Sequence, residues 1–182
     1  MRRLLLVVPV ALVFFVAGLT LFRTTTGQVG RPAAAFSLPD VAHPGRTVTL
    51  ASLRGRPAVL NFWASWCDPC RAEAAEFART ARQYGGSVRF LGMAILDGRD
   101  AVLSYMAKYH VPYGSVLDAH GDVSKAYGVT GVPETVFIDA KGVIAGHYIG
   151  AFKDGQLGPV VRDLVTTGKI QLTGRGETRP VP

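Results

Sequence analysis

The stretch that decides the fold runs from Ala58 to Cys70 and reads AVLNFWASWCDPC. Its first half, residues 58–63, is a nearly continuous apolar run, which is typical of a strand buried inside a sheet. Its second half holds both cysteines of the chain, Cys67 and Cys70. Apolar residues then recur at spacings of three and four as far as Tyr84, which predicts a helix over residues 67–84. Both cysteines therefore stand where a strand gives way to a helix.

A Cys-x-x-Cys pair in this position is suited to thiol–disulfide exchange. The unpaired N–H groups and the dipole of a helix N-terminus stabilise a thiolate, so we expect a lowered pKa for Cys67. Cys70, one turn further on, is close enough to attack a mixed disulfide formed at Cys67 and release the partner. Pro69 falls in the first helical turn, where a missing N–H is harmless.

Half of a metal site is the alternative interpretation of this pair. Zinc would need two further ligands. The histidines stand singly in predicted loops and at element ends, and each is expected to be a surface or capping residue. They are His43, His110, His120 and His147. We therefore favour redox chemistry that needs no metal and no organic cofactor.

Beyond this stretch, predicted strands and helices alternate, which indicates an α/β domain with a sheet covered on both faces. Alternating or short apolar runs predict strands at residues 47–50, 88–95, 115–117, 135–138 and 143–149. Helical spacing predicts helices at residues 100–109, 122–127 and 157–166. Residues 139–142 between the last two strands predict a hairpin turn.

The first 23 residues stand apart from this domain. Arg2 and Arg3 precede an uncharged stretch, residues 4–22, which as a helix would span about 28 Å, close to the hydrocarbon thickness of a bilayer. The positive-inside rule places the N-terminus in the cytoplasm and the rest outside. A cleaved signal peptide would have the same orientation, but its apolar region is usually shorter, so we favour a retained transmembrane anchor.

The remaining boundaries follow from composition. Residues 24–34 are expected to be a linker and residues 35–167 the folded domain. Residues 168–182, which contain several Gly and Pro residues, are expected to be a flexible tail.

Composition also excludes several classes of protein. Hydrophobic residues make up 48% and charged residues 18% of the chain, so a disordered or fibrous protein is excluded. The net charge is +7, but Arg2, Arg3 and Arg23 flank the apolar N-terminus and the other cations form no run. We expect no nucleic-acid binding, because it needs Lys and Arg gathered on one face. We expect a monomer.

Two motifs resemble the thioredoxin superfamily. Residues 61–70, NFWASWCDPC, are similar to its active-site segment. Residues 131–135, GVPET, are similar to the loop that holds a cis-proline beside the cysteine pair. The resemblance covers residues 35–167. It implies a thioredoxin-like fold, with a central mixed sheet flanked by helices and a cis bond between Val132 and Pro133.

The details resemble one branch of that superfamily. The anchor, the lead-in at residues 47–57 and the sequence GVPETVFID are similar to the membrane-tethered TlpA-like and ResA-like oxidoreductases, and within these to the cytochrome c maturation type (DsbE or CcmG). The insert of that branch corresponds to residues 97–118. The resemblance implies reduction of disulfides in apocytochrome c or its carrier, on the periplasmic side of the cell membrane. It also implies a membrane electron donor of the DsbD or CcdA type.

Proton transfer at Cys70 needs an acceptor. Thioredoxin has a buried aspartate where this chain has Asn61, and an amide cannot take up a proton. Asp97 stands roughly where ResA-like proteins carry a buried acidic residue, and Glu134 follows the proline as in the cytochrome maturation type. Either carboxylate could accept the proton. Alternatively, Asp97 could cap the helix at residues 100–109, and Glu134 could be a solvated strand-edge residue.

Substrate contacts are expected next to the cysteines. Trp66, Val132 and Pro133 would line a small apolar platform that receives the partner's disulfide. Arg71 and Lys141 are expected to be solvated charges.

Three other functions use related motifs. A general oxidant of the DsbA type would have the opposite redox poise, but commonly carries a larger helical insertion than residues 97–118 allow. A thiol peroxidase would need a Pro-x-x-x-Thr/Ser-x-x-Cys motif, which is missing around Cys67. A copper chaperone would bind Cu(I) through Cys67 and Cys70, usually with a nearby histidine. A TlpA-like protein that reduces the cysteines of a copper site would combine features of a disulfide reductant and a copper chaperone.

Overall fold

The computed structural model describes residues 28–172 and the backbone of residues 179–180. The expected anchor, residues 1–23, lies outside the described residues. Among the helices of the described part, none is long and apolar enough to cross a membrane.

A five-stranded mixed sheet forms the centre of the molecule, in the order β5-β4-β3-β7-β8. Its strands are β3 (Ala58–Trp63), β4 (Arg89–Ile95), β5 (Ser115–Asp118), β7 (Glu134–Ile138) and β8 (Ile144–Ile149). The central strand, β3, runs parallel to β4 and antiparallel to β7. All six of its residues are buried, as its continuous apolar run predicts.

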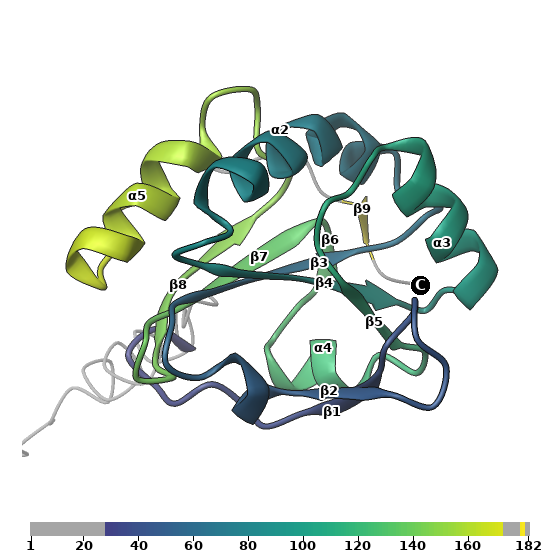
Figure 1. Ribbon diagram of the computed structural model, residues 1–182, viewed down its shortest axis with the longest axis horizontal. Helices are drawn as coiled ribbons and strands as arrows, with labels where there is room; N and C mark the ends of the chain where they lie inside the picture. The colour runs from purple at the N-terminus through teal and green to yellow at the C-terminus, as the bar shows by residue number, and fades with distance from the viewer. Residues whose placement is uncertain (1–27, 173–178, 181–182) are drawn as a thin grey trace, which may run out of the picture.

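Helices and a small hairpin cover the two faces of this sheet (Figure 1). The helices are α2 (Asp68–Tyr84), α3 (Arg99–Lys108), α4 (Asp122–Ala126) and α5 (Leu157–Thr167). In Figure 1, α2, α3 and α5 lie above the sheet, while α4 lies below it with the pair β1 (Ser37–Pro39) and β2 (Thr47–Thr49). A 3₁₀ turn, Leu50–Leu53, joins β2 to the loop before β3.

Successive residues of β3 point to opposite faces and build two separate cores. Val59 packs with Phe77 of α2 and Val161 of α5 in one cluster. Leu60 and Phe62 belong to the other cluster, in which the Phe62 ring lies 5.6 Å from that of Tyr127. The fold is thus the expected α/β arrangement, and the predicted helices and strands agree with the observed ones to within one residue at each end.

Three short strands are additional to the prediction: β1, β6 (Gly131–Val132) and β9 (Arg179–Pro180). Each has only two or three residues, which is too short for a hydrophobic period to be read. β9 pairs antiparallel with β6.

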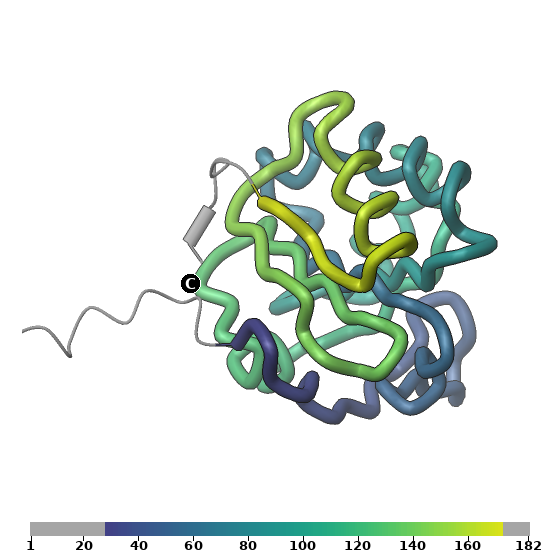
Figure 2. The backbone as a smooth tube through the Cα atoms, turned by 90° about the vertical axis from the view of Figure 1, so that its left-hand side faces the viewer, coloured from purple at the N-terminus to yellow at the C-terminus, as the bar shows by residue number. Residues whose placement is uncertain are grey.

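Parts of the expected linker and tail contact the domain. Residues 30–33 form backbone hydrogen bonds with residues 142–144, at the tip of the β7–β8 hairpin; Figure 2 shows this N-terminal segment in purple beside the green hairpin. After α5, the aliphatic side chains of Ile170 and Leu172 pack over Gly146 of β8.

Glu76 of α2 joins that helix to the start of α5. Its Oε1 accepts the Leu157 N–H at 2.8 Å and its Oε2 accepts the Gly155 N–H at 3.0 Å. The side chain also pairs with Arg79. Since Gln156, the N-cap of α5, provides no side-chain cap, the Glu76 carboxylate satisfies an N–H that would otherwise lack an acceptor.

Gly92 of β4 makes room for the side chains that support the active-site helix. A Cβ here would lie 2.1 Å from Ser115 Oγ and 2.7 Å from Trp63 Nε1. Trp63 is buried against Tyr105, with ring centroids 4.2 Å apart, and Tyr105 Oη donates a hydrogen bond to the Cys70 carbonyl at 2.7 Å.

We therefore expect Gly92→Ala to lower the free energy of unfolding by about 1–3 kcal/mol, because two buried side chains must shift. Urea unfolding of the oxidised protein would measure the loss. Gly114→Ala is the matched control, since a Cβ at Gly114 meets no atom within 4 Å. Equal stability of the two variants would contradict the expectation.

Candidate active site

The two cysteines form a disulfide at the N-terminus of α2, so the structure is that of the oxidised protein. Cys67 is the N-cap residue, and its Sγ accepts the backbone N–H of Cys70 at 3.1 Å. Pro69 lies in the first turn. In the reduced protein the same N–H and the helix dipole would favour a thiolate on Cys67. Both cysteines are buried, and Cys67 has 0% of its surface exposed.

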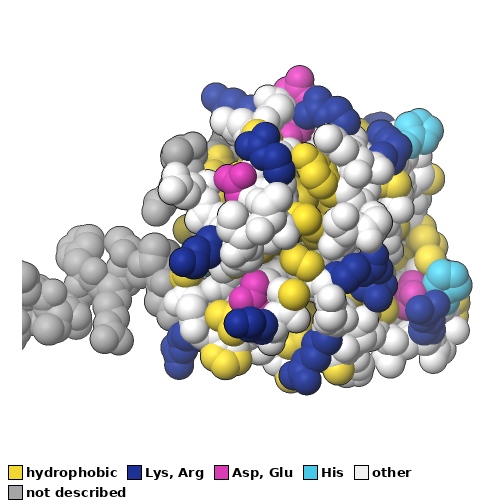
Figure 3. All heavy atoms as spheres, turned by 60° about the vertical axis from the view of Figure 1, so that its left-hand side comes forward, with side chains coloured by type: hydrophobic (Ala, Val, Ile, Leu, Met, Phe, Trp, Pro, Cys, Tyr) yellow, Lys and Arg dark blue, Asp and Glu magenta, His cyan; other side chains and the backbone are white. Residues whose placement is uncertain are grey.

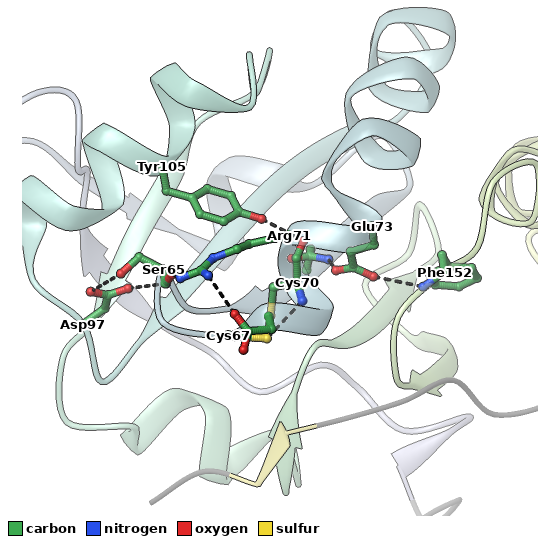
Figure 4. The surroundings of a disulfide bond; sticks show 10 residues. Ser65, Cys67, Cys70, Arg71, Glu73, Asp97, Tyr105 and Phe152 are labelled. Carbon is green, nitrogen blue, oxygen red and sulfur yellow. Dashed lines mark hydrogen bonds and ion pairs between the residues drawn. A yellow bond between two sulfur atoms is a disulfide. The ribbon is translucent and has the colours of Figure 1, made fainter.

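Asp97 holds the turn that precedes Cys67 (Figure 4). Its Oδ2 accepts the Ser65 N–H at 2.6 Å and its Oδ1 accepts the Ser65 hydroxyl at 3.0 Å. The N-cap of α3 is Gly98, so the alternative in which Asp97 caps that helix is wrong. The carboxylate instead fixes the backbone between β3 and α2.

Two further side chains stabilise this turn. Trp66 is half-buried, and its Nε1 donates to the carbonyl of Leu96 at 3.1 Å. Arg71 donates from Nη2 to the Ser65 carbonyl at 2.9 Å and from Nη1 to Asp68 at 2.7 Å. Arg71 is exposed, as expected of a solvated charge, and in addition it stabilises this turn.

The proline loop lies at the same end of the sheet as the disulfide. Glu134, the first residue of β7, pairs with Phe62, which stands next to the end of β3. The bond between Val132 and Pro133 is cis, as the resemblance implies. Val132 is buried in the same hydrophobic cluster as both cysteines.

Glu134 is fully buried and organises this loop. Its Oε1 accepts three hydrogen bonds of 2.9 Å, from the N–H and hydroxyl of Thr130 and the N–H of Gly131. Its Oε2 lies 2.6 Å from Nε2 of His147. Burial raises the pKa of this carboxyl, but the hydrogen bonds from His147 and Thr130 outweigh burial and hold the pKa below its ordinary value.

This geometry corrects two expectations. Glu134 is not a solvated strand-edge residue. His147 is not a surface or capping residue either, because its side chain is only 4% exposed and pairs with the Glu134 carboxylate.

Glu73, one turn after Cys70 on α2, is a buried carboxyl that the sequence did not lead us to consider. Its Oε1 accepts from Asn61 Nδ2 at 2.7 Å, and its Oε2 accepts the backbone N–H of Phe152 at 3.1 Å. Burial raises the pKa of Glu73 to about 8, although both hydrogen bonds act in the opposite direction. Near neutral pH the oxidised protein therefore holds Glu73 largely protonated.

Cys70 and Glu73 line the same small cavity, which measures about 10 Å³. Asn61, Trp63 and Tyr105 are among its other lining residues, whereas Asp97 and Glu134 do not line it. The volume is close to what one water molecule needs. Of Glu73, Asp97 and Glu134, Glu73 is the one that shares a cavity with Cys70.

The pattern of α2 did contain a signal for Glu73. Cys70, Ala74 and Phe77 form the buried face of the helix, and Glu73 stands on that face at a spacing of three from Cys70. A carboxyl in the apolar stripe of an amphipathic helix indicates a buried and perturbed acid.

Metal binding is not indicated at this site by the residues that the structure describes. In the part of the chain that the structure describes, no three His, Cys, Asp or Glu side chains are grouped as a metal site. Elsewhere on the surface, on the left-hand side of Figure 1 that Figure 3 brings forward, Lys and Arg side chains are dispersed among neutral and hydrophobic ones.

Comparison with known proteins agrees with this geometry. The model of the AhpC/TSA family matches residues 29–147. The thiol:disulfide interchange protein DsbE of Pseudomonas fluorescens biotype C is 40% identical over 85% of this chain and 89% of its own length. DsbE of Pseudomonas aeruginosa is 34% identical over 91% of this chain and 97% of its own length.

Solved structures give the same result. A secreted disulfide oxidoreductase of Mycobacterium tuberculosis, described as homologous to DsbE of Escherichia coli, is 31% identical with a TM-score of 0.62. The match covers 68% of this chain and 91% of that protein. The chain thus belongs to the AhpC/TSA family of thioredoxin-fold proteins and is a thiol–disulfide oxidoreductase with a Cys67–Cys70 pair, similar to the interchange proteins named DsbE.

Proposed function

We propose that this protein is a membrane-anchored reductant that acts outside the cytoplasm on disulfides of apocytochrome c or of its carrier. Its similarity to DsbE proteins over most of both chains supports this role. The predicted anchor at residues 1–23 would hold the domain on the periplasmic side of the cell membrane. A membrane electron donor of the DsbD or CcdA type would return the cysteine pair to the dithiol form.

The observation that carries the chemistry is the buried Glu73 carboxyl in the cavity that Cys70 lines. A group whose pKa is about 8 can exchange a proton with a thiol near neutral pH. We assign proton transfer at Cys70 to Glu73, in place of Asp97 or Glu134.

The cycle balances with Glu73 as the proton carrier. The reacting form of the reduced protein has Cys67 as a thiolate, Cys70 as a thiol and Glu73 ionised. Because the pKa of Glu73 is raised to about 8, this form is a minor fraction near neutral pH and grows as the pH rises. Cys67 attacks one sulfur of the substrate disulfide; that bond breaks, one substrate thiolate leaves and a mixed disulfide forms.

The second step releases the product. The Cys70 proton passes to Glu73, and the Cys70 thiolate attacks Sγ of Cys67, which breaks the mixed disulfide and frees the second substrate thiolate. Two electrons have moved from the cysteine pair to the substrate, and Glu73 holds the proton.

Asp97 and Glu134 are positioning residues in this proposal. Asp97 fixes the turn at Ser65 and thereby the start of α2. Glu134 fixes the loop at Thr130 and Gly131 that leads to the proline. Trp66, Val132 and Pro133 would form the apolar surface that meets the substrate.

A reducing poise is also supported by Glu73. A strong oxidant such as DsbA depends on a reduced form that is stabilised as a thiolate. Glu73 beside Cys70 is neutral when protonated and negative when ionised, so it offers a thiolate no opposite charge, and its ionised fraction disfavours further negative charge at the pair. Reduction of this disulfide is therefore less favourable than in an oxidant.

We expect the reduction potential of the pair to lie at or below about −200 to −230 mV, the range of glutaredoxins. Equilibration of the full chain in detergent with glutathione or dithiothreitol buffers would measure it. The reduced protein should also reduce a peptide that carries a Cys-x-x-Cys-His disulfide, and Cys67→Ser should abolish this reaction. A potential near about −120 mV, as for DsbA, would contradict the proposal and indicate an oxidant.

Glu73→Gln should slow the second step, because an amide cannot take the Cys70 proton. General acid–base catalysis typically contributes about 10²–10⁴-fold, so a mixed disulfide on Cys67 should accumulate after rapid mixing with the peptide. Acid quenching and mass spectrometry would detect it. Asp97→Asn and Glu134→Gln are the comparison variants, and accumulation in either of them but not in Glu73→Gln would reassign the proton acceptor.

The raised pKa of Glu73 also predicts how stability depends on pH. The unfolded chain loses this proton near pH 4.5, whereas the folded chain keeps it until about pH 8. The associated stability is thus fully present below pH 4.5 and is lost as the pH rises to 8.

Each unit by which the pKa of Glu73 is raised on folding corresponds to about 1.4 kcal/mol. Between pH 5 and 8 the free energy of unfolding of the wild type should therefore fall. This fall should exceed that of Glu73→Gln by roughly 3–4 kcal/mol. Urea unfolding of both oxidised proteins at several pH values would test this. If the difference in the free energy of unfolding between the two proteins does not change with pH, the pKa of Glu73 is the same in the folded and unfolded chain and the expectation is wrong.

A further inference from the structure

β9 lies against the proline loop at the edge of the active site. Its two residues pair antiparallel with β6, Gly131 opposite Pro180 and Val132 opposite Arg179. Val132 is the residue directly before the cis bond to Pro133. Figure 1 shows β9 beside β6, and in Figure 4 β9 is the pale yellow arrow below the disulfide.

The disulfide is closed to attack in this arrangement. A reductant must reach a sulfur of the pair, yet Cys67 is 0% exposed and Cys70 1% exposed. Val132 is also fully buried, although the proposed function needs it to meet the substrate. Some segment must therefore move before exchange can start.

β9 is the segment best placed to move. It comes from a distant part of the chain: the last described residues before it, Ile170 and Leu172, pack over Gly146 of β8. Its pairing with β6 involves only two residues on each strand, so little is lost when it detaches. Because Pro180 has no N–H, Arg179 supplies the only backbone N–H of this strand.

We infer that β9 is a built-in competitor for the strand-pairing edge of β6, and that a substrate docks by replacing it. The partner that fits this edge is an extended peptide segment next to a disulfide, which pairs antiparallel with Gly131–Val132 as β9 does. A tethered strand acts at a high effective concentration, so β9 would exclude segments that bind weakly. This inference rests on the proposed function, since it concerns access to the same cysteine pair.

Arg179→Pro in the full chain tests the inference, because it removes the one N–H of β9. Arg179→Ala is the matched control, since it removes the same charged side chain and keeps the N–H. The measurement is the rate at which dithiothreitol reduces Cys67–Cys70, followed by alkylation and mass spectrometry. We expect dithiothreitol to reduce the disulfide of Arg179→Pro on the order of ten times faster than that of the wild type. The reason is that the two paired positions of β9 and β6 would no longer close the site. Arg179→Ala should keep the wild-type rate.

A synthetic peptide of residues 173–182, added to Arg179→Pro, should restore slow reduction, and a scrambled peptide should not. Equal rates for wild type and Arg179→Pro, or equal acceleration by both substitutions, would overturn the inference. Reduction by dithiothreitol needs only the disulfide, so this result is independent of the proposed function. That function fails separately if the reduced wild type and the reduced Arg179→Pro protein both leave the Cys-x-x-Cys-His peptide disulfide intact.

Discussion

The burial of one carboxyl group in the cavity that Cys70 lines is the constraint on which the active site depends. Glu73 is held by the Asn61 amide of the central strand and by the backbone N–H of Phe152, beyond β8. These hydrogen bonds join α2 to two other parts of the fold. Burial nevertheless raises the pKa of the carboxyl to about 8, so its proton can be exchanged under ordinary conditions. Asn61, which stands where thioredoxin has a buried aspartate, thus donates a hydrogen bond to a buried acid on α2. In this protein the buried acid is Glu73.

The other two carboxylates have a different task because they are already saturated with hydrogen bonds. Asp97 accepts from Ser65 twice and Glu134 accepts from Thr130 and Gly131 while pairing with His147. Each fixes a loop at the same end of the sheet, one before the cysteine pair and one before the cis-proline. In the proposed mechanism, Glu73 transfers the proton, whereas Asp97 and Glu134 fix the geometry of the two loops.

Access to this site is governed by chain segments that are far apart in sequence. The loop before the cis-proline forms strand β6, and β6 is covered by β9, which follows α5. The edge that pairs with β9 is adjacent to a disulfide without exposed surface on Cys67. The residues that would carry out disulfide exchange and the segment that would control entry to the disulfide therefore belong to different parts of this fold. Glu73 and the two cysteines act from the helix side, whereas β9 acts from the proline loop.

The sequence by itself determined the longer helices and strands and the redox pair, because these depend on local patterns, whereas the two- and three-residue strands β1, β6 and β9 were not readable from it. The apolar run of residues 58–63, the helical spacing up to Tyr84 and the Cys-x-x-Cys at their junction are all readable within a few residues. Hydrophobic periodicity shows which face of an element is buried, but not which residue of another element lies opposite. The tertiary structure alone therefore decided that Glu73 contacts Phe152, that Asp97 holds Ser65, that His147 pairs with Glu134 and that β9 covers β6. Each of these contacts joins segments whose relative position is set by strand order and register, which no single stretch of the chain encodes.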